Sequence, residues 1–187
     1  MTLARLVPKE TAVVVVDIQQ KLHVAMPEAA RARVERNVGI LLDAAARLGA
    51  PVIVTEQYPK GLGPTIAPLR EKLESMQITP IEKTCFSAAE EAAFATALAK
   101  SGVRSVVLAG EEAHICVFQT ARALAAQKLD VWVVSDAVAS RSDENRQVGL
   151  DLCREAGARV TVTESVVFDW LGGAGTEDFK FVSKLVR

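Results

Sequence analysis

Cys116 stands in a segment that could do nucleophilic chemistry. It lies in GEEAHICVFQTARALAA (110–126), where an apolar strand pattern gives way to an alanine-rich helix pattern. Backbone N–H groups at the start of a helix favour negative charge, and a thiolate there has its pKa lowered from the free value of about 8.5. The same N–H groups can hold an oxyanion. The alternative is a buried cysteine that packs as a small hydrophobic residue.

Two charged residues at the ends of other apolar segments could assist such a thiol. Asp17 closes the run TAVVVVD (11–17), where it either caps the following loop or acts on a ligand. Lys83 stands in PIEKTCF (80–86), and a lysine there is unusual because an unpaired buried charge is costly. Lys83 either extends to solvent or turns inward, where it could pair with Asp17 and hold the thiol as a thiolate.

Other polar and aromatic residues lie close to these three in the sequence. Gln19 could hydrogen-bond Asp17 or a substrate, and Tyr58 and Phe86 could form an aromatic wall for a flat acyl group or pack in the core. We therefore treat Gln19, Tyr58 and Phe86 as candidate substrate-binding residues.

The two histidines and the two remaining cysteines are expected to be mainly structural. His114 precedes Cys116 by two residues in a tight turn, where the two side chains are expected to point apart, and His23 could line a pocket mouth. Cys85 could be a second reactive thiol but lacks a helix start, and Cys153 falls in the middle of a helix pattern. No Cys-x-x-Cys, His-x-x-x-His or His-Glu-x-x-His pattern is present, so we expect no metal site.

The elements that must position these residues alternate between strand and helix. Continuous apolar runs rich in β-branched residues predict strands covered on both faces, with a weaker third run. The strands are expected at 11–17, 51–57, 80–86, 103–110, 130–137 and 158–163. Helices are expected at 27–49, 88–101, from Cys116 to about 128, and at 142–157, with a short one in 66–76 and a mostly helical tail. Gly49 and Gly157 stand where helix ends favour glycine, and Ser142 where a helix begins.

This alternation predicts one doubly wound α/β domain over residues 1–187, with helices on both faces of a parallel sheet. The expected Rossmann-like strand order is 3-2-1-4-5-6, in which the first and fourth strands are neighbours. Ligands bind at this switch point, beyond the carboxyl ends of the strands. The topology therefore brings Asp17 and Cys116 together without reference to any family.

The charge and hydrophobic composition of the chain indicate which kinds of binding partner are not expected. The 187 residues carry 22 basic and 23 acidic side chains, a balance that gives no electrostatic reason to expect nucleic acid or an anionic membrane as a partner. The longest apolar run, AVVVV, has the length of a strand and not of a membrane span. Three widely spaced cysteines fit a reducing compartment, and the first residues lack the apolar core of a signal peptide, so we expect a cytoplasmic protein.

Three motifs in this order resemble the isochorismatase-like cysteine hydrolases, over nearly the whole chain. They are VVVVDIQ, EKTCFSA and GEEAHICVFQTARALAAQKLDVWVVSDAVASRS. The segments EAHICVFQTA and TEQYPKGLG look most like the isochorismatase domain-containing group. The resemblance implies a catalytic triad of Asp17 as general base, Lys83 as the residue that orients the pair, and Cys116 as nucleophile. It also implies a cis peptide between Glu111 and Glu112, which would direct the backbone N–H groups of Glu112 and Cys116 at an oxyanion.

The chain departs from parts of this family. Nicotinamidases carry an Asp-x-His metal motif after the second strand, whereas this chain has TEQYPKG with no histidine. The resemblance therefore implies neither a bound metal nor an organic cofactor, and it makes nicotinamide a doubtful substrate. True isochorismatases lack the nucleophilic cysteine, so Cys116 argues against cleavage of a vinyl ether.

The sequence thus predicts an amidohydrolase-type cysteine hydrolase that cleaves a small amide or related acyl C–N bond through a thioester on Cys116. The resemblance also implies a homo-oligomer, for which VVFDWLGGAGTEDFKFV (166–182) supplies apolar surface. Two alternatives stay open at this point. One is a non-catalytic protein of the same fold that binds a metabolite or a protein. The other is a thiol redox protein in which Cys85 resolves a disulfide.

Overall fold

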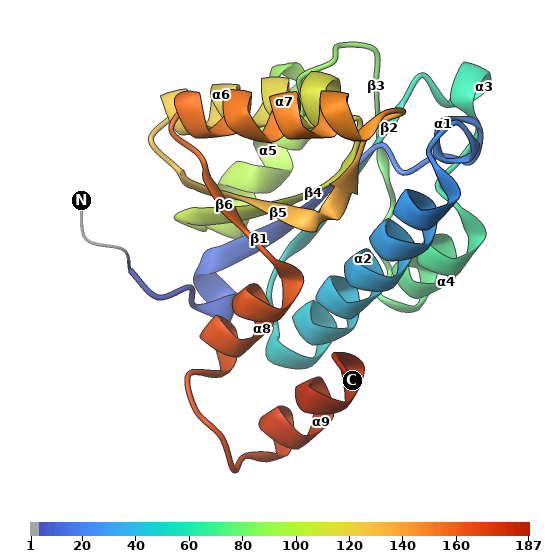
Figure 1. The fold of residues 1–187 in the computed structure, drawn as a ribbon. Helices are drawn as coiled ribbons and strands as arrows, with labels where there is room; N and C mark the ends of the chain where they lie inside the picture. The colour runs from blue at the N-terminus through green and yellow to red at the C-terminus, as the bar shows by residue number, and fades with distance from the viewer. Residues whose placement is uncertain (1–3) are drawn as a thin grey trace.

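The computed structural model describes residues 4–187 and is built on a parallel six-stranded sheet (Figure 1). The strands are β1 (Thr11–Val16), β2 (Val52–Gln57), β3 (Ile81–Lys83), β4 (Ser105–Glu111), β5 (Asp130–Ala139) and β6 (Arg159–Thr161). Their order is β3-β2-β1-β4-β5-β6, and every neighbouring pair is parallel. The doubly wound order predicted from the sequence is confirmed.

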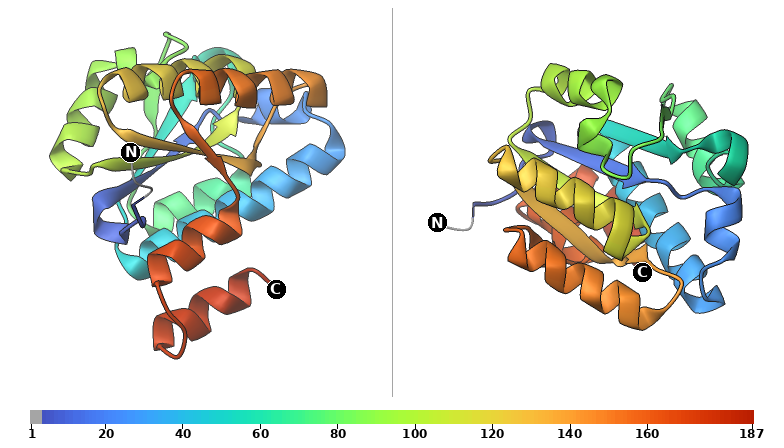
Figure 2. Two further views of the ribbon diagram at one scale, coloured as in Figure 1. Left: turned by 60° about the vertical axis from the view of Figure 1, so that its left-hand side comes forward. Right: turned by 90° about the horizontal axis from the view of Figure 1, so that it is seen from above.

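Helices cover both faces of the sheet, as Figures 1 and 2 show. The helices are α1 (Gln20–Val24), α2 (Glu28–Leu48), α3 (Pro59–Leu62), α4 (Ala67–Ser75), α5 (Ala92–Ser101), α6 (Phe118–Ala126), α7 (Asp143–Glu155), α8 (Thr163–Leu171) and α9 (Glu177–Leu185). Helices α5, α6 and α7 lie on one face, and α2, α4 and α8 on the other, with α9 packed outside α2 and α8. In residues 4–187, no helix is both long enough and apolar enough to cross a membrane.

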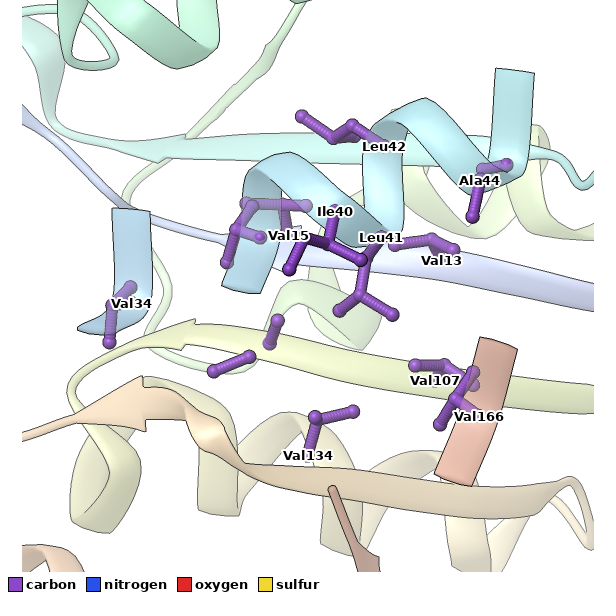
Figure 3. Packing of buried hydrophobic residues seen from close by; sticks show 14 of the residues in the cluster. Val13, Val15, Val34, Ile40, Leu41, Leu42, Ala44, Val107, Val134 and Val166 are labelled. Atoms are coloured by element: carbon purple, nitrogen blue, oxygen red, sulfur yellow. The ribbon is translucent and has the colours of Figure 1, made fainter. Parts of the chain in front are cut away.

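The central strand and the longest helix form the middle of the core. All six residues of β1 are buried, which fits a strand covered on both faces. In Figure 3 the side chain of Leu41 on α2 lies beside Val13 of β1. Val34, Val15 and Val107 belong to the same buried cluster. Helix α2 follows Pro27 and ends at Gly49, which adopts φ 75° as a left-handed helix cap. The hydrophobic pattern and the cap residues thus place α2 as the sequence predicts.

The boundaries differ from the sequence prediction at the ends that carry polar residues. Strand β1 stops at Val16, because Asp17 turns into the left-handed region with φ 55°. Strand β3 covers only Ile81–Lys83 and not the predicted 80–86. The short helix α3 lies in a segment, 58–65, where the sequence analysis places neither a strand nor a helix, and Thr65 forms an isolated bridge with Gln19. These short elements are held by tertiary contacts, which cannot be predicted from the hydrophobic periodicity of the local sequence.

Partly exposed aromatic side chains gather on the two C-terminal helices. Phe168 on α8 is 36% exposed and Phe181 on α9 is 41% exposed. Both belong to the segment that the sequence analysis assigned to an oligomer interface. The homo-oligomer stays a prediction.

Gly110 permits the close approach of β1 and β4 at the switch point. Its φ is 138°, and a Cβ atom built on it would lie 2.1 Å from the carbonyl oxygen of Val16. The two residues are register partners in the sheet. Only glycine fits at this position, directly before the segment that leads to Cys116.

We predict that Gly110→Ala lowers the free energy of unfolding by about 3 kcal/mol, because the added methyl group collides with backbone that cannot move away. Denaturant unfolding measures this loss. Gly173→Ala is the matched control, since no atom lies within 4 Å of a Cβ there. Equal stability of the two variants would contradict the prediction.

Candidate active site

Asp17 sits fully buried at the end of β1, at the centre of a polar network. Its Oδ1 accepts a hydrogen bond from Thr55 Oγ1 at 2.7 Å, and its Oδ2 accepts one from Lys83 Nζ at 2.7 Å. Its backbone N–H donates to the carbonyl of Thr55. The carboxylate is thus fixed by β2 and β3 and does not cap the following loop through its side chain.

Lys83 reaches Asp17 from β3, two strands away. Its register partner on β2 is Gln57, whose Oε1 accepts a hydrogen bond from Lys83 Nζ at 2.6 Å. The carbonyls of Cys85 and Phe86 accept from the same ammonium at 3.2 and 3.3 Å. The side chains of Lys83 and Asp17 are both 0% exposed, so the lysine turns inward and does not extend to solvent.

Cys116 is buried beside this ion pair. It lies in a π-helical turn (Ala113–Val117) that continues into α6, and it is 5% exposed. Burial and then the charge of Asp17 raise the pKa of the Cys116 thiol to about 12, while Lys83 opposes them. Hydrogen bonding to Asp17 raises this pKa further.

The lowered pKa expected from the sequence is therefore wrong. Lys83 is paired with Asp17 at 2.7 Å, and its lowering effect on the thiol pKa is outweighed by burial and by the charge of Asp17. Desolvation of the buried sulfur is the largest cause of the rise. Cys116 rests as a thiol next to a carboxylate that can accept its proton, which is the arrangement of a nucleophile with a general base.

The segment before Cys116 carries the cis peptide that the family resemblance implies. The bond between Glu111 and Glu112 is cis. The Glu112 side chain is held by Arg141, whose Nε and Nη2 lie 2.6 and 3.2 Å from its carboxylate oxygens. Arg141 follows β5, so two elements fix the residue whose N–H was predicted to face an oxyanion.

The three candidate substrate-binding residues lie in different environments. Gln19 is fully buried, and its amide bonds the backbone of Gln57 and Gly63. This position favours a structural role that ties the end of β1 to the loop after β2. Tyr58 and Phe86 are 55% and 54% exposed, which excludes core packing.

An open cleft of about 330 Å³ lies beside Lys83 at this edge of the sheet. Its lining residues are Tyr58, Pro59, Lys60, Glu82, Lys83, Thr84 and Glu91. A larger hollow between the N-terminal segment and α8 contains none of Asp17, Lys83 and Cys116. The smaller cleft is lined by Lys83 of the buried ion pair, while neither Asp17 nor Cys116 lines it.

The two histidines and the two other cysteines differ in burial and in their contacts. His114 Nδ1 lies 3.0 Å from Ser140 Oγ, which fits the predicted structural role. His23 is buried and not at a pocket mouth, with Nδ1 2.7 Å from Glu111 Oε1. Cys153 is fully buried, as predicted, whereas Cys85 is only partly buried. Residues 4–187 contain no group of three or more His, Cys, Asp or Glu side chains placed to hold a metal ion.

Sequence reasoning missed several residues that support the site. Thr55 and Gln57 hold the ion pair from β2, and Glu111 pairs with His23. Gly149 on α7 packs against the cysteine turn, since a Cβ there would lie 2.6 Å from the His114 nitrogen. A glycine inside a helix is about 1 kcal/mol less stable than an alanine there. Its presence in a predicted helix is therefore the one signal in the sequence that indicates close packing at this position.

The chain is similar to known proteins along nearly its whole length. A family model described as the isochorismatase domain matches residues 11–165. Isochorismatase domain-containing protein 2 of Bos taurus is 36% identical over 99% of this chain and 87% of that protein. The secreted isochorismatase effector Isc1 of Phytophthora sojae is 34% identical over 99% and 88%. The solved structure of MAR1 ribonuclease from Caenorhabditis elegans is 39% identical, with a TM-score of 0.88 over 98% of this chain and 92% of that one.

We predict that folded protein alkylates at Cys116 about a thousandfold more slowly at pH 8 than denatured protein does. A thiol whose pKa is raised to about 12 holds little thiolate at pH 8, and its rate should still rise about tenfold per pH unit at pH 10. Iodoacetamide labelling resolved by peptide mass spectrometry measures each cysteine. Asp17→Asn should accelerate Cys116 labelling, because it removes the negative charge that raises the thiol pKa. A rate that levels off below pH 8.5 would contradict the raised pKa.

We predict that Gly149→Ala displaces the turn that carries Cys116. The added methyl group meets backbone of Ala113 and His114, so stability should fall by about 1–3 kcal/mol although alanine favours helix. Labelling of Cys116 should become faster as its packing loosens. Val148→Ala is the control on the same helix, because Val148 is 49% exposed. Unchanged labelling and stability in Gly149→Ala would refute the close contact.

Proposed function

The chain belongs to the isochorismatase family, as its three motifs predicted, and from this premise we propose that it is a cysteine hydrolase. Its substrate is a small amide or a related acyl compound with a cleavable C–N bond. Asp17, Lys83 and Cys116 form the catalytic triad, and no step calls for a metal or an organic cofactor.

The observation that supports this proposal most is the contact of a buried thiol with a buried ion pair. Asp17 bonds Lys83 at 2.7 Å, and burial, followed by the charge and hydrogen bonding of Asp17, raises the pKa of the Cys116 thiol. The carboxylate can therefore receive the thiol proton at the moment of attack. Lys83 holds that carboxylate in place through its bonds to Gln57 and to two backbone carbonyls.

The proposed reaction has two halves. In the first, the Cys116 sulfur attacks the carbonyl carbon while its proton passes to Asp17, and a tetrahedral oxyanion forms. The C–N bond then breaks as Asp17 returns the proton to the leaving amine, which leaves a thioester on Cys116. In the second half, Asp17 takes a proton from water, the hydroxyl attacks the thioester, and the sulfur leaves with the proton from Asp17.

The oxyanion is stabilised by backbone N–H groups of Glu112 and Cys116. Cys116 lies in the first helical turn after β4, where N–H groups point toward developing negative charge. The bidentate contact of Arg141 with the Glu112 side chain supports a fixed position for this backbone. Preorganised donors of this kind are each worth about 10²–10³ in rate.

The substrate is small because the triad is nearly closed to solvent. Asp17, Lys83 and Cys116 are 0%, 2% and 5% exposed, and the adjoining cleft is modest. Tyr58 and Phe86 are exposed at this edge and are proposed to flank the acyl group. Gln19 is proposed to support the pocket floor through the backbone of Gln57 and Gly63.

Other functions lack an observation of comparable weight. A thiol redox role needs a second thiol to resolve a disulfide, and partly buried Cys85 is the candidate. A non-catalytic binding role gives no reason for the buried ion pair beside the thiol. The similar Caenorhabditis elegans protein is described as a ribonuclease. In this chain, the formal charge of −1 gives no electrostatic support for binding RNA.

We predict that a panel of small amides contains at least one that the protein hydrolyses with Cys116 and Asp17 both required. Cys116→Ala and Asp17→Asn should each reduce kcat by about 10²–10⁴-fold, since they remove the nucleophile and its base. Ammonia release measures turnover, and intact mass spectrometry with a hydroxylamine quench detects the thioester.

Cys85→Ser is the control for this experiment and should keep full turnover. A single-stranded RNA arm tests the alternative activity with the same variants. Turnover that survives in Cys116→Ala, or RNA cleavage that depends on Cys116 without any amide turnover, would overturn the proposed function.

A further inference from the structure

A buried His23–Glu111 pair lies next to the proposed catalytic residues and is not used by the proposed reaction. Nδ1 of His23 and Oε1 of Glu111 are 2.7 Å apart, a hydrogen bond that holds one proton between them. The side chains are 9% and 0% exposed. Such a pair is costly to bury, so its position in the fold calls for a reason.

The pair connects the two segments that carry the base and the nucleophile. His23 lies on α1, the helix that directly follows Asp17 and Gln19. Glu111 is the last residue of β4 and precedes Glu112, which leads into the Cys116 turn. The register of β1 with β4 ends at Val16 and Gly110. Beyond that point the chain segments separate, and the His23–Glu111 bond links them again.

Three carboxyl groups meet at these two strand ends, and each has a basic partner from a different element. Asp17 pairs with Lys83 of β3, Glu111 with His23 of α1, and Glu112 with Arg141 after β5. Asp17 and Glu112 are also the charges that act on Glu111 besides His23. Each of the three carboxyl groups at these strand ends is therefore held by a basic residue of a different element.

We propose that His23 and Glu111 form a positioning clamp that holds the Asp17 segment against the Cys116 segment. The inference rests on the proposed function, because it concerns how Asp17 is kept in reach of the thiol. The clamp residues touch neither the substrate nor the reacting atoms. They act through the backbone that follows Asp17 and the backbone that precedes Cys116.

The geometry favours positioning over simple stabilisation. Oε2 of Glu111 has no hydrogen-bond partner among residues 4–187, although it is buried. Burial also raises the pKa of Glu111, with His23 opposing that shift. A buried polar pair with one oxygen unpartnered adds little to stability, and apolar replacements of similar volume are often neutral. Loss of the pair is therefore expected to change the coupling of Asp17 to Cys116 more than the stability of the fold.

A double-mutant comparison measures this coupling. The effect of Asp17→Asn on the rate of Cys116 alkylation by iodoacetamide, between pH 7 and pH 10, is determined in two backgrounds. In the wild-type background we expect about a tenfold increase at fixed pH, because the negative charge next to the thiol is lost. In the His23→Leu/Glu111→Leu background we expect about threefold or less, because Asp17 no longer lies in a fixed place beside the sulfur.

Conservative variants distinguish the effect of the His23–Glu111 hydrogen bond from the effect of side-chain packing. Glu111→Gln keeps an acceptor for His23, and His23→Asn keeps a donor near the position of Nδ1, so both should retain the tenfold effect. His114→Leu is the matched control, since this second histidine bonds Ser140 and not the strand ends. Glu111→Leu alone is a second clamp-less variant in case the double leucine variant does not fold, because it leaves no buried carboxylate without a partner. Thermal unfolding establishes that each variant is folded before its rates are compared.

The possible outcomes distinguish the clamp from the function on which it rests. An equal effect of Asp17→Asn in both backgrounds would overturn the clamp and leave the cysteine hydrolase intact. No effect of Asp17→Asn in the wild-type background would remove the base from the proposed reaction and the clamp with it. If Asp17→Asn does not fold, Thr55→Val replaces it, because this change removes the 2.7 Å hydrogen bond to Asp17 Oδ1. Its loss should change the alkylation rate of Cys116 about threefold in the wild-type background and leave the rate unchanged in the clamp-less background, and an equal change in both would overturn the clamp.

Discussion

The buried ion pair between Asp17 and Lys83 is the contact on which the site depends. It spans three strands, because Lys83 of β3 crosses the end of β2 to reach the carboxylate after β1. Thr55 and Gln57 fill the intervening strand end with hydrogen bonds to the two charges. Removing one partner of such a pair leaves an uncompensated buried charge, which costs about 3–5 kcal/mol. The carboxyl ends of these strands are therefore held in one arrangement.

Burial of the sulfur and this ion pair together set the state in which the thiol rests. A lysine without an acidic partner would stabilise the thiolate of a neighbouring cysteine more strongly, but here Lys83 forms an ion pair with Asp17. The sulfur is buried and faces a carboxylate, so the pKa of Cys116 is raised to about 12. In the proposed mechanism, reactivity depends on transfer of the thiol proton to Asp17, and transfer depends on how closely the two segments are held. The close backbone approach at Gly110 and the packing of Gly149 on the cysteine turn serve the same requirement.

Much of the fold could be predicted from local patterns. The buried run of β1 and the amphipathic period of α2 are long and regular, and both appear where the sequence predicts them. The strand order followed from the alternation of strands and helices, because parallel strands need crossover helices of fixed handedness. That order alone brought Asp17 and Cys116 to neighbouring strand ends. The short strand β3 and helix α3 were harder, since three or four residues carry too little periodicity to mark their limits.

The sequence by itself determined the strand order, the chemical types at the switch point and the family to which the chain belongs. Only the tertiary structure decided how those groups act on one another. The inward turn of Lys83, the burial of Gln19 against the backbone of Gln57 and Gly63, and the pairing of His23 with Glu111 join residues far apart in the chain. The direction of the Cys116 pKa shift belongs to the same group, because desolvation and charge at a buried site depend on distances in three dimensions. Spacing along a chain carries no such distances, and this is why the sequence could indicate a candidate site but could not predict its electrostatics.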